Sequence, residues 1–355
     1  MGLELAGRIN THAWQAHDLE PHIVTLFPEK AVEDVSPWEY TRKTWQSLGR
    51  LQPDILALAG YEQTAMLTAF VWAKINGKIV ILMSESKADD QPRRRWKERL
   101  KRLLVRHFDA ALVGGRPQKE YAVSLGIPPD RVFVGYDVVD NEHFARGAAV
   151  ARAQEARLRR ELGLLAPYFL TVCRFIEKKN LVRLLSAYGL YRQLHPQAPW
   201  DLVLCGSGAL EAKLREIAAA LPGVNFPGFK QAGALPAYYG LAGAFIMPSS
   251  HFEQWGLVVN EAMAAGLPVL VSRACGCAPD LVQDGMNGFT FDPYDVEGLA
   301  RLMVKMSSGE ADLKAMGEAS RRIIAEWTPE VFAQNLFKAI SVCLRKKKVF
   351  FKQVF

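Results

Sequence analysis

The sequence predicts an α/β fold built from two doubly wound layers. Short apolar segments alternate regularly with longer helix-favouring segments, which is typical of parallel strands joined by helices. The alternation starts afresh in the second half of the chain, at residues 167–172. With 355 residues, 50% of them hydrophobic, the chain is also large enough for two domains that each bury a core.

The first half of the chain shows the alternation most clearly. Residues 145–165, rich in Arg and Ala, favour a helical connector over a flexible linker. Strands are expected at residues 22–27, 54–58, 78–83, 109–113 and within 131–140, and helices at 38–51, 63–75 and 92–106.

One stretch of the second half combines a strand, a loop, a helix and another strand. The apolar residues 245–247 predict a buried strand, and Gly256 opens a helix that the turn at 266–268 ends. Ligands of open α/β sheets bind at the carboxyl ends of the strands, where helix N-termini point. The backbone N–H groups at Gly256, Leu257, Val258 and Val259 are therefore expected to receive a phosphate.

Two carboxylates flank this helix start. Glu253 lies in the loop and Glu261 inside the helix; Ala262, a Gly-Leu-Pro-Val turn and the motifs at 276–280 and 284–288 follow. The set resembles the donor site of the retaining GT-B glycosyltransferases of family 4, the glycogen-synthase-like group. This resemblance implies two Rossmann-like domains that face each other across a cleft.

The resemblance also implies how the chain is divided. Residues 1–150 would form the acceptor domain and 151–329 the nucleotide-sugar donor domain, and the end of the chain, 330–355, would pack back onto the first domain. Family members usually begin with a strand and a glycine-rich loop. Here residues 3–9 resemble the helix that follows these, so the first strand is expected to be missing. A frayed amphipathic start is the alternative.

The resemblance assigns roles to several residues of the second half. Arg174 and Lys179 would clamp the diphosphate, Glu253 would contact the sugar hydroxyls, and Glu261 would hold the ribose. Fixed cations at the diphosphate would stabilise the negative charge that grows on the leaving group. Further donor contacts are expected from the glycine turn Gly206 and Gly208 and from the segment that carries Phe229 and Lys230.

The strand end near residue 84 departs from the family pattern. Many members carry a histidine there, whereas this chain has Glu85 between two serines. A carboxylate within hydrogen-bond reach could orient or deprotonate an acceptor hydroxyl. The alternative is a solvated loop carboxylate.

The charge of the chain favours anionic partners. The net charge is +7, which suits a nucleotide sugar, an anionic lipid or a nucleic acid. Residues 92–106 predict a basic amphipathic helix that could lie on an anionic membrane. The alternative is that Leu100, Leu103 and Leu104 pack on the sheet beneath a merely solvated basic face. A second basic and aromatic patch lies at residues 345–352, and no nucleic acid is expected. The membrane residues would be Arg93, Arg94, Arg95, Trp96, Lys97, Arg99, Lys101 and Arg102.

The sequence also predicts whether the reaction needs a metal ion and where in the cell the protein lies. No Asp-x-Asp pair occurs in the sequence, so neutralisation of the diphosphate by Arg174 and Lys179 without a metal is expected. The odd count of five cysteines, scattered in apolar segments, favours a reducing, cytoplasmic location. No long uncharged apolar run is present, so a membrane-spanning helix is not expected. Peripheral attachment to the inner face of a membrane stays open.

The predicted function is therefore transfer of a sugar from a nucleotide diphosphate sugar to a hydroxyl acceptor, with no cofactor other than this co-substrate. The base stays open among UDP, GDP and ADP, and polysaccharides, lipid-linked oligosaccharides, glycolipids and small metabolites are all candidate acceptors. Two alternatives also remain: a catalytically impaired scaffold of the same fold that binds nucleotide sugar or membrane, and a transferase that modifies nucleic acid, which would bind DNA with strong salt dependence.

Overall fold

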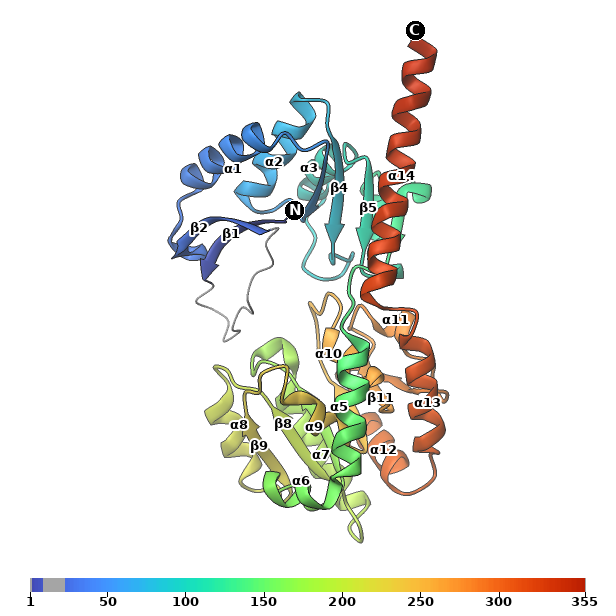
Figure 1. Ribbon diagram of the computed structural model, residues 1–355. Coiled ribbons are helices and arrows are strands. Elements are labelled where there is room, and N and C mark those ends of the chain that lie inside the picture. The colour runs from blue at the N-terminus through green and yellow to red at the C-terminus, as the bar shows by residue number, and fades with distance from the viewer. Residues whose placement is uncertain (1, 9–22, 355) are drawn as a thin grey trace.

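The computed structural model contains one parallel β-sheet of four strands and one of six, each with helices around it, and so confirms the predicted α/β class (Figure 1). It describes residues 2–8 and 23–354, and the side chains of residues 25–31 and 33–345. Within this part of the chain, no helix combines the length and the apolar composition that crossing a membrane requires.

The first sheet has the order β3-β4-β5-β6 and is parallel throughout. Its central strands are almost completely buried because helices cover the sheet, as the unbroken apolar runs predicted. The elements are β3 (Ile55–Ala59), β4 (Ile79–Ser84), β5 (Ala110–Val113) and β6 (Val132–Val134), with α1 (Pro37–Leu51), α2 (Thr64–Ile75), α3 (Arg95–Val105), α4 (Arg116–Ser124), η1 (Val32–Asp34) and η2 (Pro129–Arg131).

The start of the chain corrects the sequence prediction. Residues Gly2–Arg8 form strand β1, which pairs in parallel with β2 (Ile23–Ala31) in a separate sheet of two strands. The expectation of a helix at residues 3–9, and with it of a chain without a first strand, is wrong. Seven residues are too few for apolar periodicity to separate a helix from a strand, and here pairing with β2 decides. The expected glycine-rich loop would fall at residues 9–22, outside the described residues.

The second sheet has the order β12-β11-β10-β7-β8-β9, so the strand order reverses between β7 and β10. In a doubly wound sheet this reversal opens a crevice at the carboxyl ends of the two strands. The strands are β7 (Tyr168–Val172), β8 (Asp201–Cys205), β9 (Val224–Gly228), β10 (Ala244–Met247), β11 (Val269–Ser272) and β12 (Gly288–Phe291). The helices of this part of the chain are η3 (Glu177–Lys179), α7 (Leu181–Leu194), α8 (Glu211–Ala218), α9 (Leu235–Leu241), α10 (Leu257–Ala264), α11 (Ala278–Leu281), α12 (Val296–Ser307) and α13 (Leu313–Ile324).

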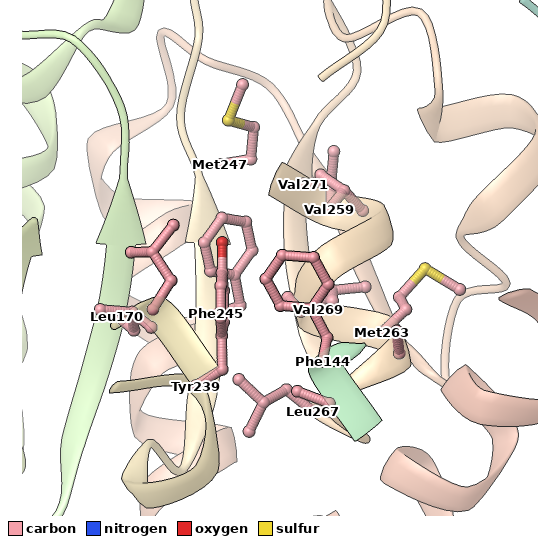
Figure 2. Close-up of a cluster of buried hydrophobic side chains, with 14 of the residues drawn as sticks. Phe144, Leu170, Tyr239, Phe245, Met247, Val259, Met263, Leu267, Val269 and Val271 are labelled. Carbon is pink, nitrogen blue, oxygen red and sulfur yellow. The ribbon is translucent and has the colours of Figure 1, made fainter. Parts of the chain in front are cut away.

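A dense apolar core fixes α10 against the second sheet (Figure 2). Val259 and Met263 of this helix are completely buried, as are Phe245 of β10 and Val269 of β11. Full burial of one such side chain stabilises the fold by about 1.5–3 kcal/mol. The N-terminal end of α10 is therefore held at a fixed place beside the carboxyl end of β10.

Three helices connect the two layers. α5 (Asn141–Ala153) and α6 (Glu155–Leu162) form the structured connector, and α5 packs on α9 and α10. The last helix, α14 (Pro329–Val354), returns to the first sheet (Figure 1). There Ala339 and Cys343 belong to one buried cluster with Ile79 and Ile81. The division of the chain at residues 150 and 329 stays a prediction.

Candidate active site

Three loops of the second sheet meet at the reversal of strand order. Arg174 follows β7, the Gly206–Gly208 turn follows β8, and Glu253 follows β10. Because the carboxyl ends of parallel strands lie at one edge of the sheet, these residues belong to one rim.

The glycine turn lies directly against the loop that carries Arg174. The Phe175 amide donates to the Ser207 carbonyl at 2.8 Å, and the Gly206 amide donates to the Gly228 carbonyl at 3.0 Å. A Cβ at Gly206 would lie 1.9 Å from the Cys173 carbonyl oxygen, so no side chain fits there. Close backbone contact therefore holds the turn at Gly206 next to the loop that carries Arg174.

Lys179 and Glu253 form the most buried ion pair of the rim. Lys179 Nζ lies 2.5 Å from Glu253 Oε2, and the two side chains are 12% and 9% exposed. The Ser249 hydroxyl donates to the same carboxylate oxygen at 2.8 Å. The neighbouring Lys178 donates to the Phe252 carbonyl at 3.2 Å, which ties the β7 loop to the β10 loop a second time.

The charge state of Glu253 follows from these partners. Burial would raise the pKa of Glu253, but the nearby charges of Lys179 and Lys178 and the hydrogen bonds from Lys179 and Ser249 outweigh it and hold the pKa below its ordinary value. Glu253 is therefore an ionised carboxylate at neutral pH, and Lys179 is its principal counter-charge.

Arg174 differs from Lys179 in its surroundings. Its side chain is exposed and makes no ion pair or hydrogen bond within the described part of the chain. A guanidinium in this condition can bind an incoming anion without giving up a protein partner.

The first turn of α10 opens onto the same rim. Gly256 caps the helix with φ 111°, a left-handed conformation that favours glycine. The Val259 amide already donates to the Gly256 carbonyl at 2.8 Å. An anion at this helix end could accept hydrogen bonds from the backbone amides of Gly256, Leu257 and Val258. The Val259 amide, which was also predicted to bind the anion, already donates within the helix.

Glu261 lies one turn further along α10. The Tyr239 hydroxyl donates to Glu261 Oε2 at 2.7 Å. Burial raises the pKa of Glu261 to about 7, and the hydrogen bond from Tyr239 opposes that rise. Phe229 is 38% exposed and lies beside Lys230, whose Nζ lies 5.7 Å from the ring centroid of Tyr238.

On the opposite side, Glu85 directly follows β4 and is half-buried. It hydrogen-bonds with Asp137, a buried residue that sequence analysis did not select, and it is close enough to Glu253 for their charges to interact. The only sequence signal for Asp137 is an acidic residue inside the apolar run 132–139.

The two sides are joined by contacts that the sequence did not reveal. Trp255 is 1% exposed and donates from Nε1 to Asn260 Oδ1 at 2.9 Å, and Asn260 Nδ2 donates to the Asp137 carbonyl at 3.0 Å. The Arg116 amide at the start of α4 donates to Asp280 Oδ2 at 2.9 Å. These bonds fix the Glu253 loop relative to the first sheet.

Helix α3 contradicts part of the packing interpretation of the basic segment, and membrane binding stays a prediction. Trp96, Leu100 and Leu103 are 56%, 57% and 52% exposed, so the expectation that these leucines pack on the sheet is wrong for Leu100 and Leu103. Leu104 does pack on the core of the first sheet. The apolar stripe faces outward because Leu104 and Val105 alone fill the contact with that core.

Two of the predicted membrane residues face elsewhere. Arg93 binds the Asp90 carboxylate and the Lys87 carbonyl, and its guanidinium lies 4.4 Å from the ring centroid of Tyr121. Lys101 is half-buried beside Glu98, 3.6 Å away. The side chains of residues 346–355, which include most of the second basic patch, are outside the described part.

Among the described residues, no group of three or more His, Cys, Asp or Glu side chains could hold a metal ion. The five cysteines are all free thiols.

Comparison with known proteins places part of the chain in a family. Residues 155–323 match the model of the family described as glycosyl transferases group 1. The chain therefore contains a segment, just under half of its length, that belongs to this family. The fold of the chain is that of the GT-B glycosyltransferases: it superposes with a TM-score of 0.71 on Anabaena HepE, crystallised with UDP, at 18% identity over 90% of this chain and 86% of that one.

The curated relatives are similar over part of the chain. The sulfoquinovosyl transferase SQD2 of Arabidopsis thaliana is 33% identical over 174 residues, 48% of this chain and 32% of that protein. A GDP-mannose-dependent alpha-(1-6)-phosphatidylinositol monomannoside mannosyltransferase of Mycobacterium tuberculosis is 31% identical over 208 residues, 56% of this chain and 52% of that protein. The chain thus spans about a third to a half of the length of these two relatives.

Proposed function

We propose that this chain transfers a sugar from a nucleotide diphosphate sugar to a hydroxyl acceptor with retention of configuration and without a metal ion. The observation that carries the proposal is the rim of Arg174, Lys179, Glu253 and the α10 N-terminus, at the point where a doubly wound sheet binds its ligand. Membership of residues 155–323 in the group 1 glycosyltransferases, which are retaining, supports it.

The diphosphate would be neutralised by protein groups. Arg174 offers an unoccupied guanidinium, Lys179 a fixed ammonium, and the first turn of α10 offers backbone N–H groups with the positive end of a helix dipole. Negative charge grows on the phosphate as the glycosidic bond breaks, so groups fixed beforehand stabilise the transition state more than the ground state.

Glu253 would accept hydrogen bonds from hydroxyls of the donor sugar. Its ionised state and its anchoring by Lys179 and Ser249 suit this role. Glu261, in the same helix, would bind the ribose hydroxyls. The sugar would then lie above the β10 loop, between the second sheet and the Glu85 side of the structure.

The reaction would take place on one face of the sugar. The bond from the anomeric carbon to the phosphate oxygen breaks, and the acceptor oxygen forms its bond to the same face of that carbon. The acceptor proton passes to the departing phosphate, which leaves as the nucleoside diphosphate. A covalent intermediate on a protein side chain would contradict this course.

The decisive test is a thermal-shift screen with UDP, GDP and ADP and with their common sugar conjugates, in the presence and absence of EDTA. Binding to the folded state raises the melting temperature by mass action and needs no known acceptor. We expect one nucleotide series to stabilise the chain equally with and without EDTA. No shift with any nucleotide, or a shift that EDTA abolishes, would contradict the proposal.

We also propose that helix α3 binds the surface of an anionic membrane on which the acceptor lies. On α3 the outward stripe of Trp96, Leu100 and Leu103 is flanked by arginines, and Arg95, Arg99 and Arg102 help to line a hollow of about 390 Å³. An exposed apolar stripe with basic flanks is the pattern of a helix that lies in a membrane interface. A lipid-linked acceptor would then be collected at the surface where the enzyme works.

Vesicle co-sedimentation tests this surface. We expect binding to vesicles of phosphatidylglycerol but not of phosphatidylcholine, with a reduction by added salt. Leu100→Ser and Arg99→Gln should each weaken binding, whereas Arg301→Gln, on a different exposed helix, should not. Equal binding by all three variants would remove α3 from the proposal.

A catalytically impaired scaffold is the second candidate. The observation that favours it is Glu85, which stands at the strand end where the family often has a histidine. Such a scaffold would show the nucleotide-dependent thermal shift without hydrolysis or transfer of the sugar. Release of the nucleoside diphosphate from the stabilising donor would exclude it.

A further inference from the structure

Asp137 is a buried carboxyl group without a cationic partner. It is 3% exposed, and its Oδ2 has no hydrogen-bond donor within the described part of the chain. The carboxyl lies close to Gly114, where an added Cβ would come within 2.5 Å of Oδ2, and Asn260 Nδ2 donates to the main-chain carbonyl of Asp137 at 3.0 Å. A buried acid in this situation normally stays protonated or shares a proton with a neighbour.

The neighbour is Glu85. The two side chains hydrogen-bond to each other, from turns 52 positions apart in the sequence. Burial, the charge of Glu85 and the bond to it raise the pKa of Asp137 to about 9. Burial also raises the pKa of Glu85, while the proton that Asp137 donates opposes the rise. The raised pKa values and the bond between the two groups favour one proton shared by the pair at neutral pH.

Other charged groups around the pair do not change this assignment. Glu253 raises the pKa of Glu85 through its negative charge, and Lys178 lowers it. The phenol of Tyr136 is affected in turn, because burial and the charges of Glu85 and Asp137 raise its pKa.

Glu85 faces a polar pocket of about 330 Å³ between the two sides of the molecule. Hydroxyl, amide and carboxyl groups dominate the lining, and none of the lining residues in the described part is Lys or Arg. Such groups exchange hydrogen bonds with sugar hydroxyls, whereas a phosphate would find two carboxylates and no cation. The polar lining residues are Tyr61, Glu62, Gln63, Ser84, Glu85, Ser86, Tyr136 and Gln254.

We propose that Asp137 positions Glu85 by sharing one proton with it, and that the pair makes this pocket select an uncharged, hydroxyl-bearing acceptor unit over a phosphorylated one. The proposal rests on the transferase function above and names the chemistry of its acceptor. Glu85 touches the acceptor and accepts a hydrogen bond from its hydroxyl; Asp137 acts only through Glu85. An anionic lipid remains compatible with the pocket, provided that its phosphate lies outside the pocket and a neutral sugar lies inside.

The first experiment follows the side-chain carboxyl carbons by ¹³C NMR between pH 4 and pH 10 in the unliganded protein. One aspartate carboxyl should stay protonated at pH 7, and its signal should vanish in Asp137→Asn but remain in the control Asp130→Asn, an exposed carboxylate. In Glu85→Gln this aspartate should ionise at a lower pH. Complete ionisation of all aspartates by pH 6 would overturn the shared proton, whatever the nucleotide screen shows.

The second experiment measures selection, with glucose and mannose against their 6-phosphates as probes, by saturation-transfer NMR in the presence of the stabilising nucleotide. We expect the uncharged sugars to bind and the phosphates to be excluded. Glu85→Gln combined with Glu62→Gln should reduce the discrimination at least tenfold. Asp137→Ala should lower sugar binding, and Asp137→Asn, which can still donate to Glu85, should restore it.

Two outcomes of this second experiment overturn the selection. One is equal or better binding of the phosphates by the wild-type chain, and the other is no binding of either uncharged sugar. If Asp137→Asn still shows the nucleotide-dependent thermal shift, the donor site is intact. Such a result would contradict the acceptor selection without contradicting the transferase function.

Discussion

Replacing Lys179 separates its two tasks, because the residue both stabilises a buried carboxylate and faces the proposed diphosphate. In Lys179→Ala, the buried carboxylate of Glu253 keeps the Ser249 hydroxyl and the more distant charge of Lys178 but loses its only ion-pair partner within the described part of the chain. Removing one partner of a buried ion pair typically costs about 3–5 kcal/mol. Arg174→Ala removes an exposed side chain without a described partner, so its effect on stability should stay within about 0.5 kcal/mol.

Nucleotide affinity should fall in both variants. A hydrogen bond to a charged group contributes about 1.5–3 kcal/mol, which corresponds to roughly 10- to 150-fold in Kd. The assay is isothermal titration with the nucleoside diphosphate found in the thermal screen, next to urea unfolding of each variant. Arg301→Gln, a charge change on the exposed face of α12, is the control.

A third variant tests the cause of the instability. Combining Lys179→Ala with Glu253→Gln removes the uncompensated charge, so much of the lost stability should return while nucleotide binding stays weak. Wild-type stability in Lys179→Ala, or unchanged nucleotide affinity in Arg174→Ala, would refute the reasoning.

Four further predictions follow from the structure. Nucleotide binding should strengthen as pH rises from 6 to 8, since the pKa of Glu261 is raised to about 7 and the ribose needs the ionised form; titration calorimetry of Glu261→Gln should show no such rise. The pKa of Asp137 is raised to about 9, so its protonated form stabilises the fold at low pH and this advantage is lost as pH rises through 9; by urea unfolding, Asp137→Asn should therefore gain stability relative to wild type between pH 5 and pH 9. Met263→Ala should lower the free energy of unfolding by about 2–5 kcal/mol in urea, because it opens a cavity under α10. Gly206→Ala should abolish the nucleotide-dependent thermal shift, since its Cβ collides with the Cys173 carbonyl.

Local patterns were sufficient where the site is built from consecutive residues. The strand, loop and helix around Glu253 lie within one segment of sequence, and their positions follow from apolar runs, Gly256 and the turn at 266–268. The approach of Lys179 to Glu253 could be expected as well, because both follow strands of one parallel sheet.

Other features depend on packing that no local pattern contains. Asp137 and Glu85 come from two turns that meet only when the sheet has formed. The outward stripe of α3 has the same periodicity as a core-facing one, so the sequence could not say which side the core lies on. At the start of the chain, residues 2–8 are a strand because of their pairing with β2.

The most direct measurement of the central claim is a crystal structure of this chain with the stabilising nucleoside diphosphate. The diphosphate should lie at the first turn of α10, bonded to the amides of Gly256–Val258 and within hydrogen-bond distance of Arg174 and Lys179. A nucleotide bound elsewhere, for example among the arginines of α3, with both of these cations unbound, would contradict it.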